Sequence, residues 1–195
     1  MTFLDLSLRD FTDALASKSA TPGGGGASAL VGALGAALGT MAGNFTVGKS
    51  KYAAVDAELR ALMAESERLR LEFLACVDED AAAFQPLSRA YGLPKDDPAR
   101  AEVMETCLRA AADVPMKILR LSCRGLALQR EFAEKGSALM VSDARTGAAF
   151  LLAAARGAAL GVRVNTELMR DRACAERLDA EAAALTEECG KWPGF

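Results

Sequence analysis

Thr21-Pro22-Gly23-Gly24-Gly25-Gly26 opens the most informative part of this 195-residue sequence, because it precedes an apolar segment that runs from Ala27 to about Val47. Within that segment, glycines recur three or four residues apart, at Gly32, Gly35, Gly39 and Gly43. On a helix these spacings place the glycines on one face, and such a face lets another helix approach closely. The pattern predicts a long helix that is buried in a bundle or packed against a second subunit.

A membrane span is the alternative for this segment, since it is long enough to cross a bilayer. It is rich in Ala rather than Leu, lacks a flanking Trp or Tyr belt, and carries the polar residues Ser28, Thr40, Asn44 and Thr46. We therefore favour a core helix and expect no membrane partner.

The rest of the chain also has helical patterns. Ser7 resembles an N-cap for a short helix that reaches about Ser17, and an amphipathic pattern runs from about Ala53 to Tyr91. Asp97-Pro98 is typical of another helix start, and we expect Pro115 to kink or break that helix. Ser142-Asp143 begins the last pair of helices, which ends at Gly190.

Composition agrees with this pattern, because Ala and Leu dominate, aromatic residues make up 6%, and no clean alternating run of β-branched residues occurs. We expect an all-α fold, a helical bundle of long, Ala-rich antiparallel helices. The length favours a single domain over residues 1–195.

Charge and cysteines limit the partners and the compartment. The net charge is −3 and there is no Lys/Arg run, so a nucleic acid is not an expected partner. The first residues lack the features of a signal peptide, which predicts a cytoplasmic protein. The cysteines are odd in number and widely spaced, and we expect buried, reduced packing residues at Cys76, Cys107, Cys123, Cys174 and Cys189.

The sequence contains no histidine. This excludes His-containing catalytic triads, HExxH zinc sites and the Glu-x-x-His pairs of di-iron bundles. We expect no metal, and acid-base chemistry near neutral pH then falls to Asp, Glu, Lys, Tyr, Cys or the substrate itself.

The segment Gly43-Asn44-Phe45-Thr46-Val47-Gly48-Lys49-Ser50 matches the P-loop pattern GxxxxGK[ST], and Leu139 to Asp143 resembles a Walker B strand. A P-loop, however, needs a buried strand before it, and here the preceding residues predict a helix. A P-loop ATPase is therefore an alternative that we do not favour.

Several blocks resemble one family in sequence order. The opening blocks are Thr21-Pro22-Gly23-Gly24-Gly25, Ser28-Ala29-Leu30 and Val47-Gly48-Lys49 to Tyr52; the later blocks are Asp80-Ala81 to Ala83-Phe84, Tyr91, Leu93-Pro94-Lys95, Val114-Pro115 and Ser142-Asp143-Ala144 to Gly147-Ala148. They resemble the formimidoyltetrahydrofolate cyclodeaminases and methenyltetrahydrofolate cyclohydrolases. Departures occur at Ser137, Ala138 and Gly161, where the family pattern suggests Asn near the turn and before Val162.

The resemblance implies a helical homodimer similar to the C-terminal domain of formiminotransferase-cyclodeaminase, without metal or a permanently bound cofactor, that acts on a tetrahydrofolate derivative. We expect a cyclohydrolase that opens 5,10-methenyltetrahydrofolate to 10-formyltetrahydrofolate. A cyclodeaminase, which closes a formimidoyl group to methenyl with loss of ammonia, is the alternative. A further alternative is a helical protein that binds folate without catalysis.

Each reaction has a cationic amidinium and a tetrahedral carbon, so a carboxylate suits both. Asp80 is the first catalytic candidate because helix periodicity places it among apolar residues, where burial raises a carboxyl pKa. The alternative for Asp80 is a buried carboxylate that pairs with an Arg or caps a helix. Asp143 is the second candidate, although Ser142-Asp143 also fits a simple helix cap.

For substrate binding, the glycine turn contributes Thr21, Pro22, Gly23, Gly24, Gly25 and Ser28. We expect its glycines to let the backbone approach the ligand and adopt positive φ, although a plain turn between helices fits as well. Lys49 and Lys51 fit the glutamate tail of folate or a solvated surface. Asn165 could contact a pterin edge or join two helices.

Overall fold

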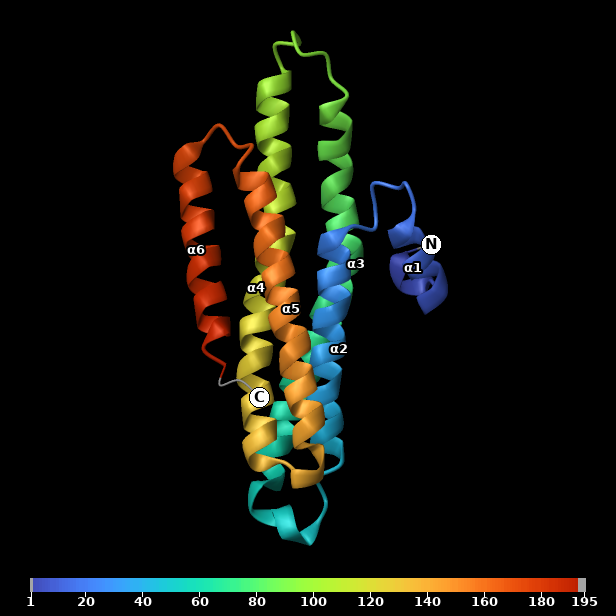
Figure 1. Ribbon diagram of the computed structural model, residues 1–195, viewed down its shortest axis with the longest axis vertical. Helices are drawn as coiled ribbons and strands as arrows, with labels where there is room; N and C mark the ends of the chain where they lie inside the picture. The colour runs from blue at the N-terminus through green and yellow to red at the C-terminus, as the bar shows by residue number, and fades with distance from the viewer. Residues whose placement is uncertain (1, 193–195) are drawn as a thin grey trace.

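The computed structural model describes residues 2–192, and these residues form helices and turns with no strand (Figure 1). The α-helices are α1 (Leu8–Ala16), α2 (Gly24–Asn44), α3 (Asp56–Tyr91), α4 (Arg100–Lys135), α5 (Val141–Thr166) and α6 (Arg172–Gly190). Short 3-10 turns are η1 (Phe3–Asp5), η2 (Ser50–Val55) and η3 (Ala138–Met140). The prediction of an all-α fold is confirmed.

Four long antiparallel helices form the bundle (Figure 1). Each of α2, α3, α4 and α5 packs against the next, and α5 packs back against α2, which closes a ring. Helix α6 lies against α4 and α5, while α1 lies outside the ring. The N-terminal turn η1 is held to α3 by a hydrogen bond of 2.7 Å from the Phe3 amide to Asp78 Oδ1.

Gly32, Gly35, Gly39 and Gly43 of α2 are buried, which confirms a close helix contact, but they do not face a single neighbour. Gly32 lies against Phe73 of α3, Gly35 against the Gly147 carbonyl of α5, and Gly39 against Phe132 of α4. Of the two alternatives from the sequence, the described residues show the contact inside the bundle. Helix α2 uses its glycines to approach three helices inside the subunit.

Two segments, Gly24–Asn44 and Ala138–Thr166, are long and apolar enough to cross a membrane by length and composition alone. In the structure they correspond to α2 and to η3 with α5, which pack against each other within the bundle. Burial in a helical core accounts for their apolar composition.

Helix α4 differs from its sequence prediction at two places. It begins at Arg100, because Asp97 Oδ1 accepts a hydrogen bond from the Ala99 amide and caps the preceding turn rather than the helix. Pro115 does not break the helix, which is continuous through it. Pro115 has no N–H to donate to the Ala111 carbonyl, and the Asn165 side chain from α5 donates to that carbonyl instead.

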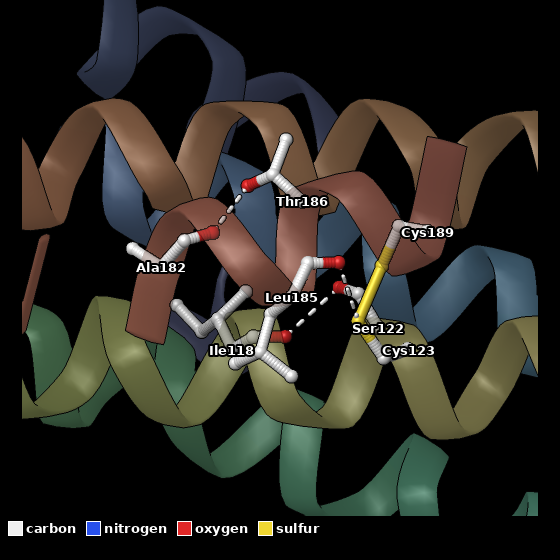
Figure 2. The surroundings of a disulfide bond; sticks show 7 residues. All are labelled: Ile118, Ser122, Cys123, Ala182, Leu185, Thr186 and Cys189. Atoms are coloured by element: carbon white, nitrogen blue, oxygen red, sulfur yellow. Dashed lines mark hydrogen bonds between the residues drawn. A yellow bond between two sulfur atoms is a disulfide. The ribbon is translucent and has the colours of Figure 1, made fainter. Parts of the chain in front are cut away.

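Figure 2 shows a disulfide between Cys123 of α4 and Cys189 near the end of α6. The two Cα atoms are 5.4 Å apart, within the usual range for this bond. The expectation that all five cysteines are reduced is therefore wrong for this pair, because helix packing brings together two residues far apart in sequence. Cys76, Cys107 and Cys174 are free.

The P-loop interpretation also fails. The residues before Lys49 are helix α2, and the described residues contain no strand that a P-loop could follow. A parallel sheet is required to position the phosphate-binding loop of an ATPase, so the match is a coincidence of spacing.

Candidate active site

A cavity of about 470 Å³ opens at one end of the bundle, between parts of α2, α3, α4 and α5 and the turn that precedes α2. Its lining consists of Ala20, Thr21, Gly23, Gly24, Gly25, Ser28, Asp80, Phe84, Leu87, Tyr91, Ala111, Pro115, Gly157, Leu160, Gly161, Val164 and Asn165. Segments distant in sequence thus meet at a site that combines apolar walls with a few polar atoms, as small-molecule sites do.

Asp80 of α3 lies in this cavity, as predicted. Its Oδ2 accepts a hydrogen bond of 3.0 Å from the Gly26 amide in the first turn of α2. Burial raises the pKa of the Asp80 carboxyl, and the Gly26 hydrogen bond offsets part of that rise. No Arg or Lys among the described residues acts on the Asp80 charge, so the alternative of an Arg partner is wrong. The alternative of a helix cap is confirmed, because the Gly26 amide that donates to Asp80 lies in the first turn of α2.

The glycine turn forms the part of the cavity wall that lies directly against this carboxylate. Gly23 is the N-cap of α2, and Gly24, Gly25 and Gly26 form its first turn. A Cβ at Gly25 would collide with the Asp80 carboxylate, whereas one at Gly24 would meet nothing within 4 Å. Glycine is therefore needed at position 25 for space.

The expectation of positive φ in this turn is wrong, because Gly48 is the only described residue with a positive φ. Thr21 and Ser28 line the cavity, and the Ser28 hydroxyl donates a hydrogen bond of 2.7 Å to the Gly24 carbonyl. Pro22 is buried behind the lining and packs near Gly26.

Asn165 of α5 also lines the cavity, beside Pro115 of α4. Its amide nitrogen donates to the Gly161 carbonyl at 2.8 Å and to the Ala111 carbonyl at 3.3 Å. Asn165 thus joins two helices, as one of the two sequence alternatives has it, and it also lies in the cavity wall.

The structure does not bring three other candidates to this cavity. Asp143 lies in the first turn of α5, where a negative charge is favourable, but the N-cap residue is Met140 and no side chain caps this helix, so the helix-cap alternative for Ser142-Asp143 is wrong. Lys49 is the N-cap of η2 and Lys51 lies within it, and this turn connects α2 to α3 at the opposite end of the bundle (Figure 1). Within one subunit, none of these side chains lines the cavity.

Sequence reasoning missed the apolar wall of the site, which consists of Phe84, Leu87, Tyr91, Leu160 and Val164. A signal was present, since Phe84, Leu87 and Tyr91 follow Asp80 at helical spacings of four, seven and eleven residues. Gly157, Gly161 and Asn165 likewise recur every four residues on the cavity face of α5. The apolar stripe of α3 is thus part core and part binding surface.

The cavity lining contains a single carboxylic acid, Asp80, and no basic side chain. In residues 2–192, no group of three or more Cys, Asp and Glu side chains is arranged to hold a metal ion. The cavity is suited to a flat, partly apolar molecule with a positive charge near Asp80.

Comparisons with known proteins agree with these features. A family model described as Formiminotransferase-cyclodeaminase matches residues 7–184. Methenyltetrahydrofolate cyclohydrolase of Methylorubrum extorquens is 40% identical over 188 residues, covering 94% of this chain and 90% of that protein. Formimidoyltransferase-cyclodeaminase of Mus musculus is 32% identical over 191 residues, which cover 96% of this chain but 35% of that protein.

A solved structure shares the fold. The crystal structure of formiminotetrahydrofolate cyclodeaminase from Thermotoga maritima superposes with a TM-score of 0.84 at 29% identity, and the match covers 95% of this chain and 92% of that one. These matches extend over nearly the whole chain and confirm the resemblance seen in the sequence blocks.

Proposed function

The chain belongs to the formiminotransferase-cyclodeaminase family, and from this premise we propose that it is an enzyme, a methenyltetrahydrofolate cyclohydrolase that opens 5,10-methenyltetrahydrofolate to 10-formyltetrahydrofolate. The observation that carries the proposal is a cavity lined by one half-buried carboxylate and no basic side chain. The methenyl substrate is a cation at its reacting carbon, and the carboxylate of Asp80 complements that charge.

In this proposal Asp80 acts as the general base. Its carboxylate takes a proton from the water that adds to the amidinium carbon between N5 and N10, giving a neutral tetrahedral carbinol. Asp80 then returns the proton to N5 as the bond from that carbon to N5 breaks. The hydroxyl proton leaves to solvent, and the formyl group remains on N10. The raised pKa of Asp80 brings it closer to the range in which a carboxyl group can both accept and return a proton.

The apolar wall explains how a folate fits. Phe84, Leu87 and Tyr91 offer surface to the aminobenzoyl ring, while the turn at Gly23–Gly25 lies close enough for backbone contact with the pterin. We propose that the tetrahydrofolate derivative is the substrate and that no cofactor stays permanently bound.

The cyclodeaminase is the second candidate, and the structural likeness to the Thermotoga maritima cyclodeaminase favours it. There N10 attacks the carbon of the protonated formimidoyl group on N5, which already carries an NH₂. Asp80 takes the N10 proton and passes it to this NH₂ as it leaves as ammonia, which leaves the methenyl cation. The same carboxylate serves both reactions, so the cavity alone does not choose between them. The chain is 40% identical to a methenyltetrahydrofolate cyclohydrolase and covers 90% of that protein, and this similarity favours the cyclohydrolase reaction.

We further propose a cytoplasmic homodimer without membrane association. Large apolar side chains outside the cavity are exposed on α2 and α5, at Leu34 and Phe150, and such residues are favourable in a subunit contact. Mass measurement in solution tests the dimer, and cell fractionation tests the location.

The enzymatic proposal is tested with two substrates in parallel. Purified protein receives 5,10-methenyltetrahydrofolate or 5-formimidoyltetrahydrofolate, and methenyl absorbance is followed against Asp80→Asn, which corrects for spontaneous hydrolysis. Accelerated loss of absorbance with the first substrate supports the cyclohydrolase. A gain of methenyl absorbance with 5-formimidoyltetrahydrofolate, without accelerated loss with the methenyl substrate, identifies a cyclodeaminase. If the absorbance changes with neither substrate, the remaining candidate is a non-catalytic folate-binding protein.

A further inference from the structure

Pro115 creates an unusual acceptor in the wall of the cavity. In α4 the carbonyl of Ala111 would normally accept a hydrogen bond from the amide four residues later, but that residue is Pro115, which has no N–H. A buried carbonyl without a donor is costly. The Asn165 side chain supplies the donor from the neighbouring helix, 3.3 Å away.

This contact fixes the direction of the Asn165 amide. Its NH₂ group donates to two carbonyls, Ala111 at 3.3 Å and Gly161 at 2.8 Å. A flipped amide would place Oδ1 against both carbonyl oxygens and would lose both hydrogen bonds. The side chain is therefore held with its NH₂ group on the helices, which leaves Oδ1 as its only uncommitted polar atom.

No donor among the described residues bonds to Asn165 Oδ1, and the residue lines the cavity that contains Asp80. Gly161 and Gly157 lie one and two turns earlier on the same face of α5, so neither position places a side chain beside Oδ1, and Ser28 packs close to α5 at Gly157. A Cβ at Gly161 would lie 3.1 Å from the Pro115 Cβ, so the two helices are already close there. A planar ring can therefore approach Oδ1 without meeting a side chain from these two positions.

We propose that Asn165 Oδ1 accepts a hydrogen bond from the N3–H and 2-amino edge of the pterin ring, and so determines which way the ring enters the cavity. This inference rests on the proposed function, since it takes a reduced folate as the ligand. The pyrimidine edge of a pterin presents adjacent donors at N3 and the 2-amino group, and a fixed, uncharged acceptor suits them. Asp80 comes from α3, so the pterin edge and the reacting carbon are contacted from two different helices.

The test pairs a change in the protein with a change in the substrate. Wild type and Asn165→Ala are each assayed with 5,10-methenyltetrahydrofolate and with its 2-desamino-2-methyl analogue, which lacks the 2-amino donor. We expect wild type to prefer the 2-amino substrate by roughly tenfold in kcat/KM. Asn165→Ala should lose this preference by slowing the 2-amino substrate more than the analogue, which keeps only the N3–H donor.

Asn165→Ala leaves the Ala111 carbonyl without its donor and could unfold, so a second variant is needed. Pro115→Ala/Asn165→Ala restores a backbone N–H to that carbonyl while still removing Oδ1. We expect the double variant to fold and also to show no preference for the 2-amino group. Pro115→Ala alone frees the amide to rotate and should give an intermediate preference.

Equal slowing of both substrates in the two Asn165 variants would overturn the proposal, because it would indicate a purely structural role. A wild type that uses both substrates equally well would also overturn it, while the proposed function would stand. Absence of turnover, together with absence of heat on titration with either reduced folate, would overturn both.

Discussion

Asp80 carries a charge that the fold stabilises with one hydrogen bond from the Gly26 amide and with no cation. Burial raises the pKa of this carboxyl above its ordinary value of about 4. The ionised form is thus less favourable in the folded protein than in the unfolded chain. The contribution of Asp80 to stability is therefore greatest below that ordinary value and is lost as pH rises through the raised pKa.

Replacing Asp80 with Asn should separate catalysis from stability. Asn can still accept the Gly26 hydrogen bond, and it carries no desolvated charge, so at pH 7 we expect Asp80→Asn to be at least as stable as wild type. Turnover should fall by roughly 10²–10⁴-fold because the base is gone. Thermal melting and turnover measured on the same preparation check both parts.

The pH dependence gives an independent readout. In wild type, kcat/KM should fall as pH decreases through the raised pKa of Asp80, and the residual activity of Asp80→Asn should lack this acid limb. Asp143→Asn is the comparison variant, since Asp143 does not line the cavity. An Asp80→Asn enzyme that turns over normally beside an inactive, folded Asp143→Asn would show that the wrong carboxylate was chosen.

Gly25 and Gly24 form a matched pair for the role of the turn. A Cβ at Gly25 would collide with the Asp80 carboxylate, while one at Gly24 would meet no atom within 4 Å. We expect Gly25→Ala to displace Asp80 and to lower kcat by roughly 10-fold or more, since small misplacements of a catalytic group are costly. Gly24→Ala should keep kcat near the wild-type value, with any loss seen in KM, because Gly24 lines the cavity but does not contact Asp80. An equal loss of kcat in both variants would show that the turn is sensitive to any added side chain.

At this scale the sequence predicted the candidate base but not its surroundings. Asp80 was found because helical periodicity places it on an apolar stripe, which is local information. The role of Pro115 was not predictable, because its consequence depends on Asn165, a residue fifty positions later on another helix. The importance of Gly25 likewise depends on a carboxylate from α3, which helix spacing alone does not locate.

Among the elements, α2 depends most on small side chains. A Cβ at Gly39 would lie 2.7 Å from Gln129 Nε2 and 2.9 Å from the Phe132 ring, and both side chains are fully buried. Gly to Ala in a helix ordinarily stabilises by about 0.5–1 kcal/mol, whereas overpacking a core costs about 1–3 kcal/mol. The second effect should prevail at this position.

We therefore expect Gly39→Ala to lower the melting temperature, with Gly39→Leu more severe. Gly24→Ala lies in the same helix without a neighbour within 4 Å and serves as the control. An unchanged melting temperature for Gly39→Ala would mean that Phe132 and Gln129 move aside at no cost.

Helix existence was predictable throughout, but helix partners were not. The spacing of Gly32, Gly35, Gly39 and Gly43 predicted a narrow glycine face, and that face is directed into the bundle, where neighbouring glycines contact different helices. Sequence spacing specifies the direction of a side chain around its own helix. It does not specify which of three packed helices lies in that direction.

For the molecule as a whole, the bundle and its outermost helix are joined by packing and by one covalent bond. Leu178, Ala182 and Cys189 are the buried face of α6, and the disulfide from Cys189 to Cys123 fixes the end of this helix to α4 (Figure 2). No residue of α6 lines the cavity. Stability and activity should therefore respond differently to loss of this bond.

Thiol titration of the denatured, non-reduced protein should find three free thiols of the five cysteines, and all five after reduction. Denaturation is required because burial raises the pKa of the Cys76 thiol to about 12, which suppresses its reaction in the folded state. Five free thiols before reduction would show that the two cysteines lie together without a bond.

The disulfide joins residues 66 apart in sequence, so it restricts the unfolded chain substantially. We expect Cys123→Ser/Cys189→Ser to lower the free energy of unfolding by about 2–4 kcal/mol, with turnover of methenyltetrahydrofolate within about twofold of wild type. Cys107→Ser, at a free and half-buried cysteine, is the control for the substitution itself.

A single unfolding transition in both variants would support one domain over residues 1–195, because α6 would then unfold with the bundle. Two transitions in the double variant would instead show that α6 depends on the disulfide, and a large loss of turnover would mean that its packing on α4 and α5 maintains the cavity from behind.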